Sequence, residues 1–212
     1  MQFIDLLVYD FDGTLVDTKN DIALSVNLTL KELGLIQKEP SEIFSYIGNG
    51  MGQLLEKALG GSSYSDVENA IKIFRRIYDK HLIDQTKYYP DCRQVIQYFS
   101  HKKQAICSNK PEYFIRRILK EFNGEALFSP IVGGDTTSFK KPNPEVLLQI
   151  INERKSPKDL TVLIGDSRVD VETGKRAGVL TCGVTYGIGG KESVEDADFV
   201  IDHIAELKEL FY

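Results

Sequence analysis

Short apolar runs alternate with longer amphipathic stretches along most of this chain. The apolar runs have the length of strands and occupy residues 4–9, 104–107, 130–132, 161–164, 180–184 and 197–201. The amphipathic stretches have the length of helices and occupy residues 91–100, 111–122, 144–153, 170–177 and 203–210. Strands that alternate with helices are typical of βαβ units, which form parallel sheets with helices on both faces. The pattern therefore predicts an α/β fold with a mostly parallel sheet.

One segment interrupts this alternation. From about residue 18 to residue 85 the apolar positions follow helical spacing, and no strand pattern is convincing. Three helices are expected, one ending near Gly34, one ending at Gly60 and one over residues 65–82. We therefore predict a core of residues 1–16 and 87–212 with a helical insert over residues 17–86. Its two connections should lie close together, so the insert is either a mobile lid over the strand ends or a fixed layer.

Composition narrows the class of protein. The 212 residues suit one large domain or one domain with an insert, and 42% hydrophobic with 27% charged residues is typical of folded, soluble proteins. The net charge of -5 provides no general attraction for nucleic acid or for anionic membranes, so neither is expected as a partner. No apolar run approaches the ~20 residues of a membrane span, and no signal-peptide pattern occurs at the N-terminus. A cytoplasmic protein is expected.

The cysteines and histidines show no pattern of catalytic or metal-binding chemistry. Cys92, Cys107 and Cys182 are odd in number and far apart, without a CxxC pair. We expect them to be buried as small hydrophobic side chains. The three histidines have no local partner pattern either, so surface or helix positions are expected for them and catalysis by histidine is not favoured.

Four polar clusters lie next to the predicted strands, where open α/β sheets bind their ligands. They are Asp10-Phe11-Asp12-Gly13-Thr14, Ser108-Asn109-Lys110, Lys140-Lys141-Pro142-Asn143-Pro144 and Gly165-Asp166-Ser167-Arg168-Val169-Asp170. Each has an ordinary explanation when taken alone, such as a turn, a helix cap or a surface lysine. Asp166 and Asp170 are different, since two acids this close at a strand-to-helix turn repel each other unless a cation lies between them.

Taken together, the clusters complement one another chemically. Carboxylates from two strand ends are hard oxygen ligands that suit Mg²⁺, while Ser108, a helix N-terminus and Lys141 suit a phosphoryl group. Asp10 is placed to attack phosphorus and form an aspartyl-phosphate without a histidine or serine nucleophile. Asp12 is placed to protonate the leaving oxygen and then to deprotonate water. The sequence predicts a phosphoryl-transfer site.

These motifs resemble those of the haloacid dehalogenase superfamily, specifically its phosphatases with a helical cap after the first strand. The first motif is Asp10-Phe11-Asp12-Gly13-Thr14-Leu15, and the others are Ser108-Asn109-Lys110, Lys141 in Lys-Pro-Asn-Pro, and Gly165-Asp166-Ser167 with Asp170. All four occur in order, and the resemblance covers essentially the whole chain. It implies a mostly parallel, Rossmann-like three-layer sandwich with an inserted all-helical cap domain.

The resemblance also implies roles for the acidic and basic residues. Asp10 is implied to be the nucleophile and a Mg²⁺ ligand, and Asp12 the general acid/base that also offers its backbone carbonyl to the metal. Asp166 is implied to be the third protein ligand, with Asp170 supporting the metal or its waters. Lys141 is implied to screen the nucleophile from the anionic substrate.

Phosphate binding and substrate contacts are assigned in the same way. Ser108 and the backbone of Asn109 are implied to hold the phosphoryl oxygens. Thr14 is grouped with these phosphate-binding residues because its hydroxyl is expected to support the first loop. The alternative is a purely structural role for Thr14 in the turn. The cap loop around residues 46–50 looks like that of phosphoglycolate phosphatases, and its candidate substrate contacts are Gly48, Asn49 and Gly50.

These expectations define a function and its alternatives. Asp12 speaks against true dehalogenases and against phosphonate-cleaving members, which leaves a Mg²⁺-dependent phosphomonoester hydrolase acting on a small phosphorylated metabolite. Phosphoglycolate is the first candidate. A pyrophosphatase, a sugar-phosphate phosphatase and a β-phosphoglucomutase share the core and stay open. A phosphate- or metal-binding regulatory module is the non-enzyme alternative, and both a monomer and a homodimer are compatible with the sequence.

Overall fold

The computed structural model describes residues 1–61 and 63–212, and a six-stranded parallel sheet forms its centre. In spatial order the strands are β5 (Ile131–Val132), β4 (Lys103–Cys107), β1 (Leu6–Tyr9), β6 (Thr161–Gly165), β7 (Leu180–Val184) and β8 (Phe199–Ile201). Every pair of neighbours in this sheet is parallel. The chain adds strands on one side of β1 and then crosses to the other side, so a topological switch point lies between β1 and β6.

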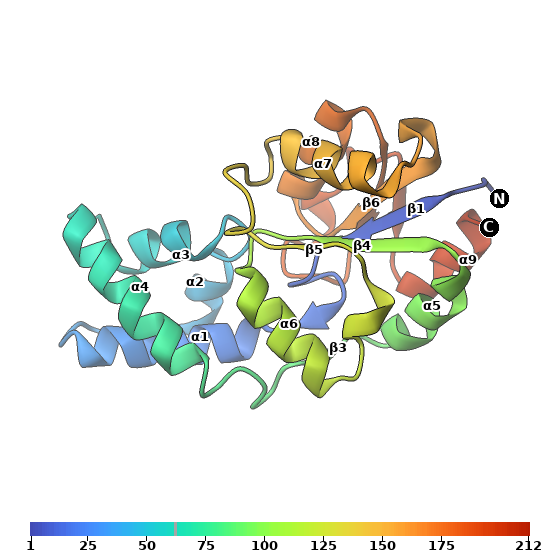
Figure 1. Ribbon diagram of the computed structural model, residues 1–212. Coiled ribbons are helices and arrows are strands. Elements are labelled where there is room, and N and C mark those ends of the chain that lie inside the picture. Colours follow the sequence, from blue (N-terminus) through green and yellow to red (C-terminus); the bar gives the residue numbers. More distant parts are fainter. Residues whose placement is uncertain (62) are drawn as a thin grey trace.

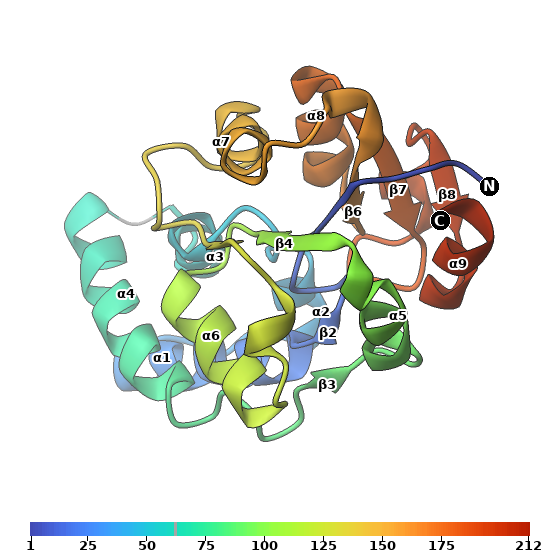
Figure 2. The same cartoon turned by 45° about the vertical axis from the view of Figure 1, so that its right-hand side comes forward.

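Helices cover both faces of the sheet (Figures 1 and 2). Helices α7 (Glu145–Arg154) and α8 (Arg168–Ala177) lie on one face, and α5 (Cys92–Tyr98), α6 (Glu112–Glu121) and α9 (Leu207–Leu210) lie on the other. The alternation of side chains along β1 serves both layers, since Leu6 and Val8 belong to the cluster beneath α7 and α8 while Leu7 and Tyr9 belong to the opposite one. The expected three-layer α/β architecture is confirmed.

The predicted elements of the sheet and its covering helices are present with small shifts of their ends. Two predicted helices are partly 3-10 helical, because residues 99–101 and 204–206 tighten into short turns. The 3-10 turns are η1 (Phe99–His101), η2 (Glu125–Leu127), η3 (Lys158–Leu160), η4 (Lys191–Ser193) and η5 (Ile204–Glu206). Within the described residues, every helix is too short or too polar to cross a membrane. All three cysteines are buried and free, as predicted.

Four further helices gather beside the sheet, on the left in Figure 1. They are α1 (Lys19–Glu32), α2 (Pro40–Phe44), α3 (Met51–Ala58) and α4 (Tyr64–Tyr78), and α1 packs against the other three. The helical character expected for this segment is confirmed. Helix α2 was not predicted, because five residues are too few for a periodicity, although Pro40 at its first position is a typical start signal.

The entry and exit of this helical segment lie side by side. Strand β2 (Val16–Asp17) pairs antiparallel with β3 (Lys87–Tyr88), one strand on each side of the segment. Asp21, fully buried in the first turn of α1, accepts hydrogen bonds of 2.8–3.0 Å from the backbone N–H groups of Gln85 and Thr86. The expected closeness of the two connections is confirmed. The division into a core of residues 1–16 and 87–212 and a cap of residues 17–86 stays a prediction.

The Asp21 contacts generate a stability prediction. Replacing Asp21 with alanine leaves two backbone N–H groups without their acceptor, so we expect Asp21→Ala to lower the free energy of unfolding by about 2 kcal/mol in urea denaturation. Asp84→Ala is the matched control, because Asp84 lies on the surface and pairs with His81. It should change stability by less than about 0.5 kcal/mol. Equal effects of the two substitutions would contradict the proposed strength of this connection.

Candidate active site

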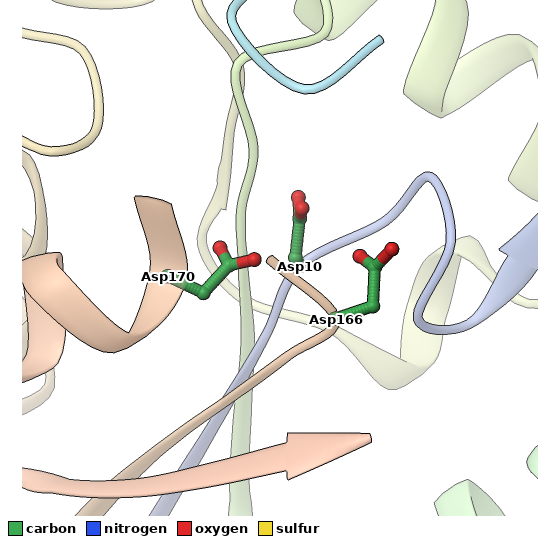
Figure 3. A group of neighbouring side chains, drawn as sticks. All are labelled: Asp10, Asp166 and Asp170. Atoms are coloured by element: carbon green, nitrogen blue, oxygen red, sulfur yellow. The ribbon is translucent and has the colours of Figure 1, made fainter. Parts of the chain in front are cut away.

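Three buried carboxylates meet where β1 and β6 end. Asp10 follows β1, Asp166 follows β6 and Asp170 lies in the first turn of α8. Figure 3 shows Asp10 between the other two, and one oxygen of each carboxylate lies within 4.8 Å of the others. Because β1 and β6 are neighbours at the switch point of the sheet, acids far apart in the sequence converge here. Three ionised carboxylates this close repel one another strongly.

Lys141 compensates part of this negative charge. Its Nζ lies 3.0 Å from Asp10 Oδ1 and 2.5 Å from Asp170 Oδ1. Burial alone lowers the pKa of Lys141, but the charges of Asp10 and Asp170 outweigh it and raise the pKa overall, so the ammonium stays charged. Burial, together with the charges of Asp170 and Asp10, raises the pKa of Asp166 to about 7. One lysine for three carboxylates leaves an excess of negative charge that fits a divalent cation with oxygen ligands, such as Mg²⁺.

The backbone around Asp166 is shaped to hold its carboxylate. Gly13 has φ +84°, and a Cβ on it would lie 2.3 Å from Asp166 Oδ2, so this position requires glycine. The N–H of Gly189 donates a 3.0 Å hydrogen bond to Oδ2, and the hydroxyl of Thr14 donates a 3.2 Å bond to Oδ1. Thr14 is fully buried and does not line the adjoining cavity. This contact favours the structural alternative for Thr14 over phosphate binding.

Asp170 is fixed by the start of α8. Ser167 and Asp170 form a capping box, in which each side chain bonds to the backbone N–H of the other. The Ser167 hydroxyl also donates a 2.5 Å hydrogen bond to Asp170 Oδ2, so Oδ1 is left to face Lys141. A local helix-start motif thus orients a carboxylate of the cluster.

The second motif connects three parts of the site. Ser108 follows β4, is buried, and lines the cavity. The side-chain amide of Asn109 donates 3.0 Å hydrogen bonds to the carbonyl groups of Gly48 and Lys141, and its Oδ1 accepts the Lys141 N–H at 3.0 Å. This amide is therefore occupied by backbone partners and ties the Gly48 loop to the Lys141 segment. The phosphate contact expected of Asn109 involves its backbone, which these bonds leave open.

Asp12 points away from the carboxylate cluster. Its Oδ1 accepts a 2.6 Å hydrogen bond from the Thr18 hydroxyl, and Lys110 Nζ lies 3.0 Å from Oδ1 and 3.2 Å from Oδ2. Its side chain does not join the group formed by Asp10, Asp166 and Asp170. The metal contact expected of Asp12 involves its backbone carbonyl, so the two arrangements are compatible.

A cavity of about 390 Å³ lies between the strand ends and helices α1–α4. The predicted residues that line it are Asp10, Asp12, Gly48, Asn49, Gly50, Ser108, Asn109 and Asp166. The helical segment adds a largely apolar wall made of Ile22, Phe44, Ile47, Met51, Leu54 and Phe74. Lys141 and Asp170 are buried behind the carboxylates and do not line the cavity. The core therefore contributes polar groups and the helical segment contributes mainly apolar ones.

Some residues of the site had no assigned role in the sequence analysis. Lys110 and Tyr78 line the cavity and contact each other, and Gly189 holds Asp166. The sequence feature that could have indicated a role for Gly189 is the glycine-rich stretch after the predicted strand at residues 180–184. Lys110 stood inside a recognised motif, but the sequence showed no reason for it to face Asp12.

The fold and the site define a class, namely α/β enzymes that act on a ligand at the carboxyl ends of parallel strands. Residues 7–184 match the haloacid dehalogenase-like hydrolase family. A phosphoglycolate phosphatase from Aquifex aeolicus (strain VF5) is 35% identical over 207 residues, covering 97% of this chain and 95% of that protein. A phosphoglycolate phosphatase from Colwellia psychrerythraea is 34% identical over 203 residues, covering 92% and 90%.

Solved structures agree with this assignment. A crystal structure from Haemophilus somnus 129pt, described as a predicted phosphoglycolate phosphatase, superposes with a TM-score of 0.91 and 25% identity over 99% of both chains. The chain belongs to the haloacid dehalogenase-like hydrolase family and is a phosphatase of that superfamily. The resemblance inferred from the four motifs is confirmed.

The buried carboxylates generate a prediction about pH and metal. The folded protein holds a proton on Asp166 up to about pH 7, whereas the unfolded chain loses it near 3.8. Between these values the folded state binds more protons, so without divalent cations stability should fall as pH rises through 7. At pH 8 and 100 times its Kd, Mg²⁺ should add about 2.7 kcal/mol to the free energy of unfolding, and it should raise the melting temperature more at pH 8 than at pH 5.

Thermal melts of two variants test this assignment. Asp166→Asn should lose both the Mg²⁺ shift and this part of the pH dependence. Asp159→Asn, a change at an exposed aspartate, should keep both. A Mg²⁺ shift of wild-type size in Asp166→Asn would show that the ion binds elsewhere.

Proposed function

We propose that this protein is a Mg²⁺-dependent phosphomonoester hydrolase that acts through an aspartyl-phosphate on small phosphorylated metabolites, with phosphoglycolate as the first candidate. The observation that carries the proposal is the cluster of Asp10, Asp166 and Asp170 with Lys141, at the base of a cavity that Asp10 and Asp12 both line. Family membership supports the hydrolase chemistry.

The metal would be held by the carboxylates of Asp10, Asp166 and Asp170 together with the backbone carbonyl of Asp12. When bound, it supplies positive charge that offsets the phosphoryl oxygens. Lys141 adds to this effect from behind Asp10, since its ammonium contacts the carboxylate that must approach an anionic group. Two negative groups can meet at this position only with such compensation.

In the first step an Asp10 oxygen forms a bond to phosphorus while the bond from phosphorus to the leaving oxygen breaks. Protonated Asp12 gives its proton to that oxygen, and the leaving group departs as an alcohol. In the second step Asp12 takes a proton from water, whose oxygen attacks phosphorus and releases Asp10 and inorganic phosphate. The Ser108 hydroxyl and the backbone N–H of Asn109 would hold the phosphoryl oxygens throughout.

Two features of the cavity bear on the substrate. The curated relatives are phosphoglycolate phosphatases, and a two-carbon phosphate fits easily within about 390 Å³. Arg168 at the start of α8 also lines the cavity, and among the described ion pairs it has no acidic partner, so it is available for a second anionic group of the substrate. The apolar wall favours a second candidate, a monoester with an apolar leaving group, because that surface gains from burial. Pyrophosphate would gain nothing from that wall.

The first test is phosphate release with phosphoglycolate, pyrophosphate, sugar phosphates, nucleotides and an aryl phosphate. We expect Mg²⁺-dependent turnover with organic monoesters exceeding pyrophosphate, and a loss of at least about 10³-fold in kcat for Asp10→Asn. Asp159→Asn should behave as wild type. Product analysis separates a mutase, which would return the phosphoryl group to the sugar. Appreciable turnover by Asp10→Asn would exclude the aspartyl-phosphate route.

Gly50 tests the contribution of the loop at residues 48–50. It has φ +86°, and a Cβ on it would lie 3.2 Å from the carbonyl oxygen of Asn109. We expect Gly50→Val to lower kcat/KM by about 10- to 100-fold while the Mg²⁺-induced shift in melting temperature is retained. Gly52→Ala is the matched control, because a Cβ there meets no atom within 4 Å. Loss of the Mg²⁺ shift together with turnover would indicate misfolding.

A further inference from the structure

Two side chains hold Asp12, and through them it is connected to both ends of the helical segment. Thr18, immediately before α1, donates directly to Asp12 Oδ1 at 2.6 Å. Tyr78, the last residue of α4, accepts a 2.7 Å hydrogen bond from Lys110 Nζ, the same ammonium that contacts both oxygens of Asp12. The Asp12 carboxylate is therefore connected directly to Thr18, which precedes α1, and indirectly to α4 through Lys110.

Lys110 is enclosed at this position. Only 3% of its side chain is exposed, and its ammonium lies 4.7 Å from the centre of the Tyr78 ring. A buried ammonium is costly unless it is paired, and among the described residues this one pairs with Asp12 and donates a hydrogen bond to Tyr78. The side chain of Lys110 therefore has a defined place from which to direct Asp12.

Tyr78 is equally fixed. Its ring stacks on the Phe74 ring of the same helix, with the ring centroids 5.3 Å apart. It also makes an edge contact with the Phe114 ring of α6, with the centroids 5.0 Å apart. Tyr78 is 1% exposed. The hydroxyl oxygen that accepts from Lys110 is thus held by rings from the helical segment and from the core.

We propose that Lys110, itself held by Tyr78, is a positioning residue that orients the Asp12 carboxylate for proton transfer to the leaving oxygen. This inference rests on the proposed function, in which Asp12 is the general acid/base. Asp12 and Lys110 both line the cavity, and Lys110 reaches Asp12 from the end of β4. Without the ammonium, the Asp12 carboxylate keeps, among the described side chains, only the bond from Thr18, and it can rotate away from the leaving group. General acid catalysis needs this geometry within hydrogen-bond reach.

The leaving group provides a readout that a purely structural role would not change. p-Nitrophenolate departs readily without a proton, phenolate needs more help, and benzyl alkoxide needs a proton most. p-Nitrophenyl, phenyl and benzyl phosphate are similar in size and all carry an aromatic ring that suits the apolar wall. A defect in the orientation of Asp12 should therefore grow along this series, while a general loss of folded enzyme should affect all three equally.

We expect Lys110→Met to lower kcat about 100-fold for benzyl phosphate and less than about fivefold for p-nitrophenyl phosphate, with KM changed less than about threefold. Tyr78→Phe keeps the ring and removes only the hydroxyl, so it should give the same trend with a loss of about three- to tenfold for benzyl phosphate. Tyr78→Phe also serves as the second variant if Lys110→Met folds poorly. Uniform losses along the series in both variants would overturn the proposal.

A double-mutant cycle links the effect to Asp12. If Lys110 acts through Asp12, Asp12→Asn with Lys110→Met should be no slower on benzyl phosphate than Asp12→Asn alone. Multiplicative losses would overturn the positioning role. Lys120→Met and Tyr113→Phe are the controls, because Lys120 is exposed at the end of α6 and the Tyr113 hydroxyl contacts Asp79 at the surface. Both should leave all three rates unchanged.

The outcome is separable from that of the proposed function. Wild-type turnover that needs Mg²⁺ and is lost in Asp10→Asn supports the hydrolase mechanism whatever Lys110 does. With that mechanism in place, uniform or multiplicative losses overturn only the positioning role. A wild-type protein that releases no phosphate from phosphoglycolate or from any of the three esters would overturn both.

Discussion

The mutual repulsion of three buried carboxylates is the constraint on which the rest of the site depends. Asp10, Asp166 and Asp170 can lie within 4.8 Å of one another only because the sheet brings β1 and β6 together and because Lys141 offsets part of their charge. The surrounding backbone accommodates them, with glycine at position 13 beside the Asp166 carboxylate. The remaining negative charge suits a cation, and in the proposed mechanism that cation in turn offsets the charge of a phosphoryl group.

The path of the chain adds a second constraint. Because the helical segment leaves and re-enters the core through the paired strands β2 and β3, both its ends lie near the first loop. Asp21 strengthens this junction by accepting two backbone N–H groups from the returning chain. The same arrangement brings Thr18 to Asp12, and Tyr78 to the Lys110 ammonium that contacts Asp12. The start of the segment and the proposed acid/base residue are thus joined by a hydrogen bond.

Much of this organisation could be predicted from the sequence. The alternation of apolar runs and helical stretches predicts the parallel sheet, and the rule that ligands bind after the strands selects Asp10, Ser108 and Asp166 without a structure. Helix α2 was not predicted, because its five residues are too few to show a helical periodicity. The contact of Lys110 with Asp12 could not be predicted, because it joins residues that lie 98 positions apart in the sequence, at the ends of two strands. The orientation of the lysine side chain follows from the packing of Tyr78, which only the structure shows.

The two halves of the cavity determine different properties of the enzyme. The strand ends supply the carboxylates, the lysine and the serine, to which the proposed mechanism assigns the attack on phosphorus and the balance of charge. The helical segment supplies Phe44, Met51 and Phe74 and the loop at residues 48–50, which in the proposed mechanism would face the leaving group. An apolar wall stabilises a leaving group that buries carbon, while Arg168 on the core side attracts one that carries a second charge. In the proposed mechanism, preference among substrates therefore depends on the balance between that apolar wall and Arg168, whereas the attack on phosphorus depends on the groups at the strand ends.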